Sequence, residues 1–157
     1  MNEPISRKNN RRFRIQIGLI LVFSGLIIFI LGVKPDWFGA DRSPIVGFVQ
    51  ISVFLIGLAS ICLGGYLALN ALWNGTEKTI AADFGFRLVS TGFVISVASG
   101  MADVIGFGNQ PSPAIPYFGP WQATGVMLGE LIIIIGFILL IPPAHRDHKK
   151  HPKELTD

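Results

Sequence analysis

The sequence is poor in cysteine and in charge. Its single cysteine, Cys62, cannot form a disulfide within the chain, and no histidine lies near it in sequence to complete a metal site. We therefore expect Cys62 to pack as a small apolar side chain. Only 15% of the residues are charged, and they gather in short segments between long apolar runs. This distribution is typical of a membrane protein.

The sequence also lacks the motifs of common soluble enzymes. It contains no glycine-rich phosphate loop, no nucleophile-elbow sequence and no HExxH pair. We therefore expect no enzyme activity and no cofactor. The net charge of +3 does not indicate nucleic-acid binding, because the basic residues lie beside the apolar runs rather than in a separate patch. We expect no nucleic-acid partner.

Four apolar segments are long enough to cross a bilayer as helices, which requires about 20 residues each. We place them at residues 13–33, 45–73, 86–108 and 124–141. The first segment is too long for the apolar part of a secretory signal, and the sequence after it is a poor cleavage site, so we expect it to be retained. The sequence therefore predicts an all-α polytopic integral membrane protein, a bundle of four transmembrane helices.

The basic residues are distributed unequally between the two sides of this bundle. Residues 1–14, 74–87 and 142–157 hold eleven of the thirteen Lys and Arg residues, whereas the two other loops hold only Lys34 and Arg42. By the positive-inside rule, this asymmetry predicts a cell-membrane protein with both termini in the cytoplasm. The basic segment 1–12 and the tail 142–157 are expected to contact anionic lipid headgroups, which attract each nearby Lys or Arg by about 1 kcal/mol.

Three histidines recur at every third position of the C-terminal tail, as His145, His148 and His151. Strong zinc sites usually draw their ligands from fixed structural elements and include cysteine or acidic partners. This tail is highly charged and contains Pro152. We expect a solvated tail and no metal site.

The two halves of the chain resemble each other weakly. Gly18 of the first predicted span recurs as Gly92 of the third, and a slightly larger offset places Gln50 opposite Glu130. These matches suggest two helical hairpins related as a parallel repeat, of the kind found in some transporters. Apolar chains rich in glycine also match by chance, so the repeat stays a hypothesis.

Small residues at regular spacing mark a contact face on every predicted span. Lipid is as apolar as leucine, so transmembrane helices associate through close backbone contact and interhelical hydrogen bonds. The faces comprise, in chain order, Gly18, Gly25, Gly32, Ser60, Gly64, Gly92, Gly100, Gly125, Gly129 and Gly136. We expect most of these faces to pack within the monomer and the remainder to mediate homo-oligomer or partner contacts.

Two acidic residues, Asp103 and Glu130, lie inside the predicted spans. The predicted topology places them at neighbouring depths in the outer half of the membrane. An ionised Asp at a helix centre costs about 2.5 to 3.5 kcal/mol on insertion scales, and no basic residue occupies these half-spans. The candidate intramembrane polar site consists of Glu130, Asp103, Gln50, Ser96 and Ser99.

Three interpretations of this polar site stay open. The acids act as neutral hydrogen-bonding groups that fix helix register, they bind a proton or cation on a transport pathway, or they receive a basic side chain from a partner subunit. We favour a non-enzymatic accessory, scaffold or assembly protein that packs against itself or a larger membrane complex. The alternatives are a small oligomeric proton- or cation-coupled transporter or channel, and a membrane enzyme acting on a lipid-like substrate.

The predicted orientation can be tested by cysteine labelling in a variant that lacks Cys62. Cysteines introduced near Arg11 and Lys150 should be protected from an impermeant reagent in intact cells, whereas one near Asp41 should react, because the basic segments face the cytoplasm. The reverse labelling pattern would overturn this orientation.

Overall fold

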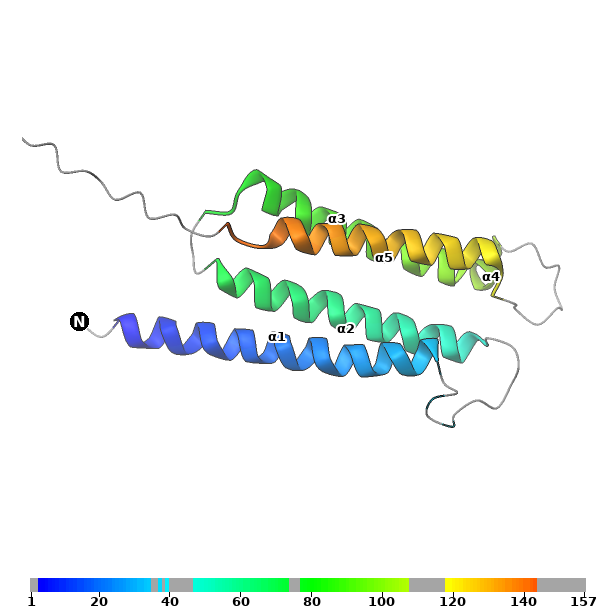
Figure 1. The fold of residues 1–157 in the computed structure, drawn as a ribbon, viewed down its shortest axis with the longest axis horizontal. Coiled ribbons are helices and arrows are strands. Elements are labelled where there is room, and N and C mark those ends of the chain that lie inside the picture. Colours follow the sequence, from blue (N-terminus) through cyan, green and yellow to red (C-terminus); the bar gives the residue numbers. More distant parts are fainter. Residues whose placement is uncertain are drawn as a thin grey trace, which may run out of the picture.

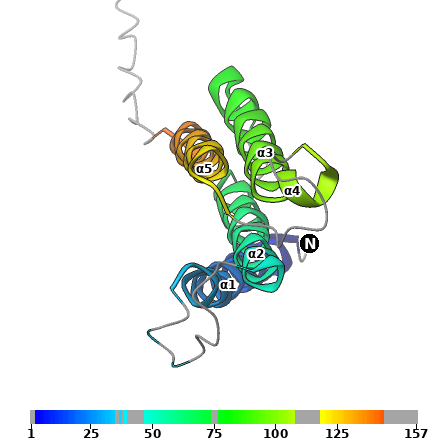
Figure 2. The ribbon, with the colours of Figure 1, turned by 90° about the vertical axis from the view of Figure 1, so that its right-hand side faces the viewer.

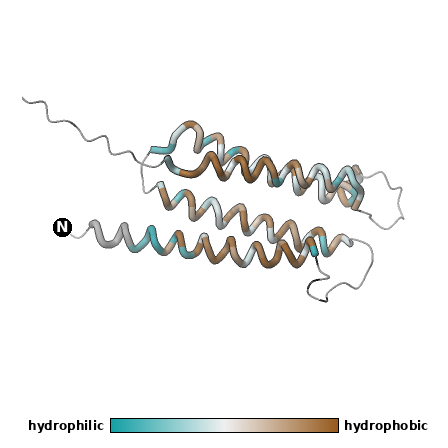
Figure 3. Tube along the Cα trace, in the orientation of Figure 1, coloured by the Kyte–Doolittle hydropathy of each residue, from teal (hydrophilic) through white to brown (hydrophobic). Residues whose placement is uncertain are grey.

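A computed structural model describes residues 3–34, 37, 39, 47–73, 77–107 and 118–143. Within these residues the chain forms helices and no strand: α1 (Glu3–Val33), α2 (Phe48–Leu72), α3 (Ile80–Gly100), α4 (Ala102–Ile105) and α5 (Pro120–Leu140). All except α4 are long and apolar enough to cross a membrane, and Figure 3 shows hydrophobic residues along most of their length. The predicted all-α membrane protein with four spans is confirmed.

Several helix ends differ from the predicted spans. The first helix begins at Glu3 rather than at residue 13, because no glycine or proline after Pro4 interrupts the basic segment. The third helix begins at Ile80 rather than at residue 86. Thr79 caps this helix, its Oγ1 accepting a hydrogen bond from the N–H of Ala82 at 3.3 Å. The hydropathy pattern therefore located the spans but not the polar helical ends.

The third helix also ends earlier than residue 108. It stops at Gly100, and the chain turns at Met101 into the short helix α4. Gly106 ends α4 in a left-handed conformation, with φ of 86°, which glycine adopts without steric cost. Asp103 therefore lies on α4, outside the third span in which the sequence pattern placed it.

The four long helices form two pairs, α1 with α2 and α3 with α5 (Figure 1). We call the end of the bundle where α1 begins and α5 finishes the terminal end, and the opposite end the distal end. In the first pair, the two backbones approach closely at small residues. A methyl group added to Gly18 would lie 2.7 Å from the carbonyl oxygen of Gly64, and one added to Gly25 would lie 2.8 Å from Cβ of Ser60.

The second pair makes the same kind of contact. A methyl group added to Gly129 would lie 2.6 Å from the carbonyl oxygen of Gly92, and one added to Gly136 would lie 2.8 Å from that of Gly85. The buried residues of α5 recur at alternating steps of three and four: Val126, Gly129, Ile133, Gly136 and Leu140. This spacing is typical of helices that pack with a left-handed supercoil.

The α2 helix joins the two pairs, and Figure 2 shows it between α1 and the α3–α5 pair. Three clusters of buried apolar side chains follow one another along the bundle. They contain Ile51, Phe54, Leu55 and Val126 at the distal end, Leu58, Val89 and Ile133 in the middle, and Trp73, Ala82 and Leu140 at the terminal end. In the last cluster Nε1 of Trp73 donates a hydrogen bond to the carbonyl oxygen of Leu140 at 3.0 Å.

The helix contacts also bear on the suggested repeat. Gly18 lies against Gly64 in the first pair, as Gly92 lies against Gly129 in the second. The packing therefore matches Gly18 with Gly92, as the sequence pattern did, and matches Gly64 with Gly129 at a smaller offset. The match of Gln50 with Glu130 requires a larger offset, which the helix packing does not support.

We predict that Gly129→Ala destabilises the protein and that Gly100→Ala does not. Overpacking an interior typically costs about 1 to 3 kcal/mol, and the new methyl group at Gly129 would meet backbone atoms of α3. At Gly100 the nearest atom would be Cγ2 of Ile51 at 3.5 Å, an ordinary contact. Thermal unfolding in detergent, followed by circular dichroism, measures the difference, with the exposed Ile134→Leu as a second control. Equal stability of all three variants would show that the glycine contact has little structural role.

Candidate intramembrane polar groove

The distal half of the bundle contains a cavity of about 300 Å³ lined by residues of α1, α2 and α5. Figure 2 shows α1 and α5 on the same side of α2. Among the lining residues, Phe29 and Val33 come from α1, Phe54 comes from α2, and Met127 comes from α5. We call this cavity the distal groove. Most of its lining is apolar, as expected for a surface within lipid.

Two polar side chains, Gln50 and Glu130, also line the distal groove. Both are partly buried. Glu130 lies seven residues along α5 from Ala123, another lining residue, so the groove extends about 10 Å along that helix. Within the described part of the chain, neither side chain has a hydrogen bond or an ion pair. The groove therefore holds a carboxyl and a carboxamide group with unused hydrogen-bonding capacity.

The helical segments that line the groove contain no basic residue that could neutralise Glu130. The helices α2 and α5 contain no lysine, arginine or histidine, and neither does the part of α1 that follows Arg14. A polar group in hydrocarbon costs free energy unless it is paired. The groove is thus suited to receive a hydrogen-bond donor or a cation from outside the chain.

The two candidate serines lie elsewhere, between α3 and α5. Ser96 is fully buried, and its Oγ donates a hydrogen bond to the carbonyl oxygen of Val126 at 3.4 Å. The side chain of Ser99 lies against Gly125, where an added methyl group would be 2.7 Å from Cβ of Ser99. These contacts assign both serines to helix packing rather than to the groove.

Asp103 is also separate from the groove. It lies on α4, beyond Ser99, whose side chain is level with Gly125 of α5. Glu130 lies five residues from Gly125 in the opposite direction along the bundle, so at least about 7 Å separates the levels of the two acids. Asp103 therefore does not lie level with Glu130, and it is not among the residues that line the distal groove.

The sequence pattern did not single out the apolar residues that shape the groove. Phe29, Phe54 and Met127 have the same character as side chains that face lipid, so hydropathy offers no signal for them. Gln50 and Glu130 could be found because polar residues are rare within spans. Gln50 and Glu130 line one groove because of the position of α2 relative to α5, which depends on tertiary packing.

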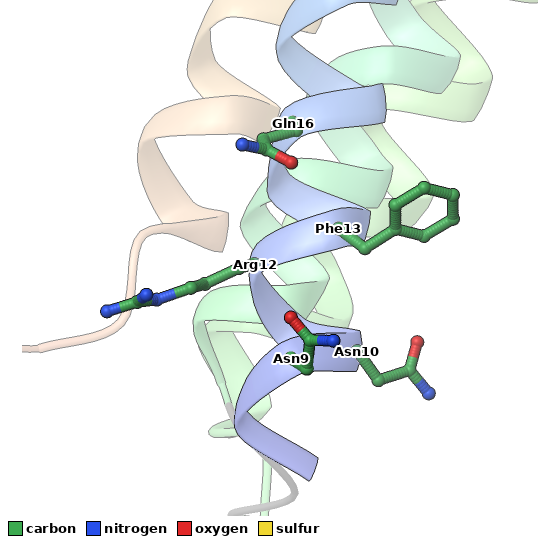
Figure 4. Close-up of a pocket in the computed structure, with 5 residues that line it drawn as sticks. All are labelled: Asn9, Asn10, Arg12, Phe13 and Gln16. Carbon is green, nitrogen blue, oxygen red and sulfur yellow. The ribbon is translucent and has the colours of Figure 1, made fainter. Parts of the chain in front are cut away.

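A second hollow, of about 560 Å³, lies along the terminal part of α1. Figure 4 shows Arg12 and Gln16 extending to one side of the helix, and Phe13 and Asn10 to the other. Nearby, Nε of Arg11 is buried without a hydrogen-bond partner among the described residues. These side chains offer several N–H donors, which suit an anionic group such as a lipid phosphate.

Comparison with known proteins adds no functional assignment. Searches against protein-family models, curated proteins and solved structures found no match to the chain. Within the described ranges, no group of three or more His, Cys, Asp and Glu side chains is placed to hold a metal ion. His145, His148 and His151 lie outside those ranges.

We predict that Glu130→Leu leaves the stability of the isolated protein unchanged or raises it, because Glu130 has no hydrogen bond in the described structure to lose. Trp73→Phe serves as the comparison, since it leaves the buried carbonyl oxygen of Leu140 without the indole donor and should cost about 1 to 3 kcal/mol. Thermal unfolding of both variants in detergent distinguishes the two cases. A loss in Glu130→Leu as large as that in Trp73→Phe would mean that Glu130 fixes helix register.

Proposed function

We propose that this protein is a non-enzymatic accessory subunit that assembles with another membrane protein in the cell membrane, with both of its termini in the cytoplasm. The observation that carries the proposal is Glu130 in the distal groove, a carboxyl group within the membrane that has no partner in the described structure. A subunit whose intramembrane acid is satisfied only on assembly accounts for that arrangement.

The use of the small-residue faces supports the same proposal. The closest contacts of Gly18, Gly64, Gly92 and Gly129 are all made within the chain. These glycines are therefore not available for packing against a partner. The surface left for assembly consists of larger apolar side chains and the distal groove.

The first helix has the most exposed surface of the four spans. In its most apolar stretch of 18 residues only 17% of the residues are buried, whereas 39% are buried in the corresponding stretch of α2. Its main contact within the chain is with α2. The remaining faces of α1, including the wall of the distal groove, are open to lipid or to another protein.

The packing favours an accessory role over a transport role. A proton or cation pathway through a membrane requires a succession of polar groups or water. Between Glu130 and the terminal end, the bundle interior is closed by the cluster of Leu58, Val89 and Ile133, and then by the cluster containing Trp73 and Leu140. None of these five residues is among the residues that line the distal groove.

An enzymatic role is also less well supported. Acid–base chemistry with two carboxyl groups needs both groups within reach of one substrate. Asp103 lies on α4 and does not line the distal groove, so Glu130 is the one acidic residue among the described residues of its lining. Gln50 supplies an amide, which does not titrate.

Native electrophoresis of membranes solubilised in mild detergent tests the accessory proposal. We expect the protein to migrate with at least one other integral membrane protein in a fixed ratio, and we expect purified protein in proteoliposomes to show no flux under a proton, sodium or potassium gradient. Migration as a free monomer, together with a pH-dependent flux that Glu130→Gln abolishes, would instead establish the transporter alternative.

A further inference from the structure

We propose that the distal groove binds one transmembrane helix of a different membrane protein, and that this helix carries a lysine or arginine that pairs with Glu130. The inference rests on the proposed accessory function and names the partner of the same site. It follows from the shape of the groove, from the carboxyl group without a partner among the described residues, and from the absence of basic residues in α2, in α5 and in α1 beyond Arg14.

The walls of the groove present the surface that a helix requires. On α5, the lining residues Ala123, Met127 and Glu130 are followed by Ile134, which lies just beyond the groove; the steps of four, three and four residues place all four on one face. The side chains of Met127 and Ile134 are 68% and 60% exposed. This row is thus free along more than two turns of α5 to receive the side chains of another helix.

The opposite wall has matching periodicity. On α1, Leu26, Phe29 and Val33 are separated by three and four residues, and both Phe29 and Val33 line the groove. Leu26 and Val33 are exposed. Two rows with near-heptad spacing, one on each side of the groove, form the pattern of holes into which the side chains of a third helix pack.

Charge complementarity indicates the chemistry of that helix. A lysine or arginine would donate a charge-assisted hydrogen bond to the carboxylate of Glu130, and the pair would carry no net charge in the hydrocarbon. Gln50, toward the distal end of the groove, adds amide donors and an acceptor for a second polar group on the same helix. An apolar helix would leave both groups unpaired.

A second copy of this chain fits the groove less well. The helices α2 and α5, and α1 beyond Arg14, contain no basic residue, so a second copy brings no cation to the depth of Glu130. A small ligand is also disfavoured. The cavity of about 300 Å³ is at the lower limit of typical ligand pockets, roughly 300 to 1,000 Å³, whereas its elongated lining suits a helix.

The proposal can be tested with synthetic transmembrane peptides. One peptide is a leucine–alanine helix with a single lysine in the third of its length nearest the distal side, and the control peptide has leucine at that position. Each carries a dansyl group at its distal end and contains no tryptophan. Energy transfer from the native tryptophans to dansyl, in phosphatidylcholine vesicles containing the purified protein, measures binding. Trp37 and Trp121, both exposed, lie at the distal end.

We expect the lysine peptide to bind about tenfold more tightly than the leucine peptide, which corresponds to about 1.4 kcal/mol. Glu130→Gln should reduce this preference to less than about twofold, because the neutral amide cannot form the ion pair. Asp103→Asn should retain the preference, since Asp103 does not line the groove.

Two further variants test the location of binding. Ala123→Phe fills the groove and should weaken binding of the lysine peptide, whereas Val94→Phe should not, because Val94 is exposed on α3 away from the groove. Equal affinity for the two peptides, or a preference that survives Glu130→Gln, would overturn the proposal. Self-association that Ala123→Phe abolishes would identify a second copy as the occupant and would overturn it as well.

The outcomes separate this inference from the accessory function. A native complex with another membrane protein, combined with no preference for the lysine peptide, would refute only the helix-docking inference. The absence of any native complex would refute the accessory function whatever the peptides do.

Discussion

Close approach of helix backbones at small residues is the contact on which the rest of this structure depends. Within lipid, burial of apolar side chains gives little net drive for association, so van der Waals contact between backbones becomes decisive. Gly18 and Gly64 make such a contact between α1 and α2, and Gly92 and Gly129 make it between α3 and α5. Each helix pair is therefore a narrow unit whose small residues are turned inward.

This use of the small residues determines how the two pairs meet. They join through larger side chains around α2, including Phe54, Leu58 and Trp73. The distal groove lies where α1 and α5 are both beside α2 and where Gln50 and Glu130 have no partner within the described chain. The polar groove is thus a consequence of two tightly packed pairs joined by one central helix.

Sequence patterns predicted the parts of the molecule that depend on local composition. Four spans follow from hydropathy, and Gln50 and Glu130 stand out because polar residues are costly in lipid. Thr79 caps α3, which extends that helix beyond its apolar part. Hydropathy therefore placed the start of α3 too late in the sequence. The position of Asp103 outside the third span depends on the turn after Gly100, for which hydropathy has no signal. The groove itself depends on which apolar residues meet, and lipid-facing and protein-facing residues look alike in this sequence.

A scan of oxygen accessibility along α5 tests most directly the claim that each helix pair is held by its small-residue face. Spin labels would be placed one at a time from Ala123 to Phe137 in a variant lacking Cys62, leaving out Gly129 and Gly136, and their collisions with dissolved oxygen measured in vesicles. The account predicts minima at Val126 and Ile133, which are buried on the same face as these glycines, and maxima at the exposed positions between them. A profile without this periodicity, or maxima at Val126 and Ile133, would contradict it.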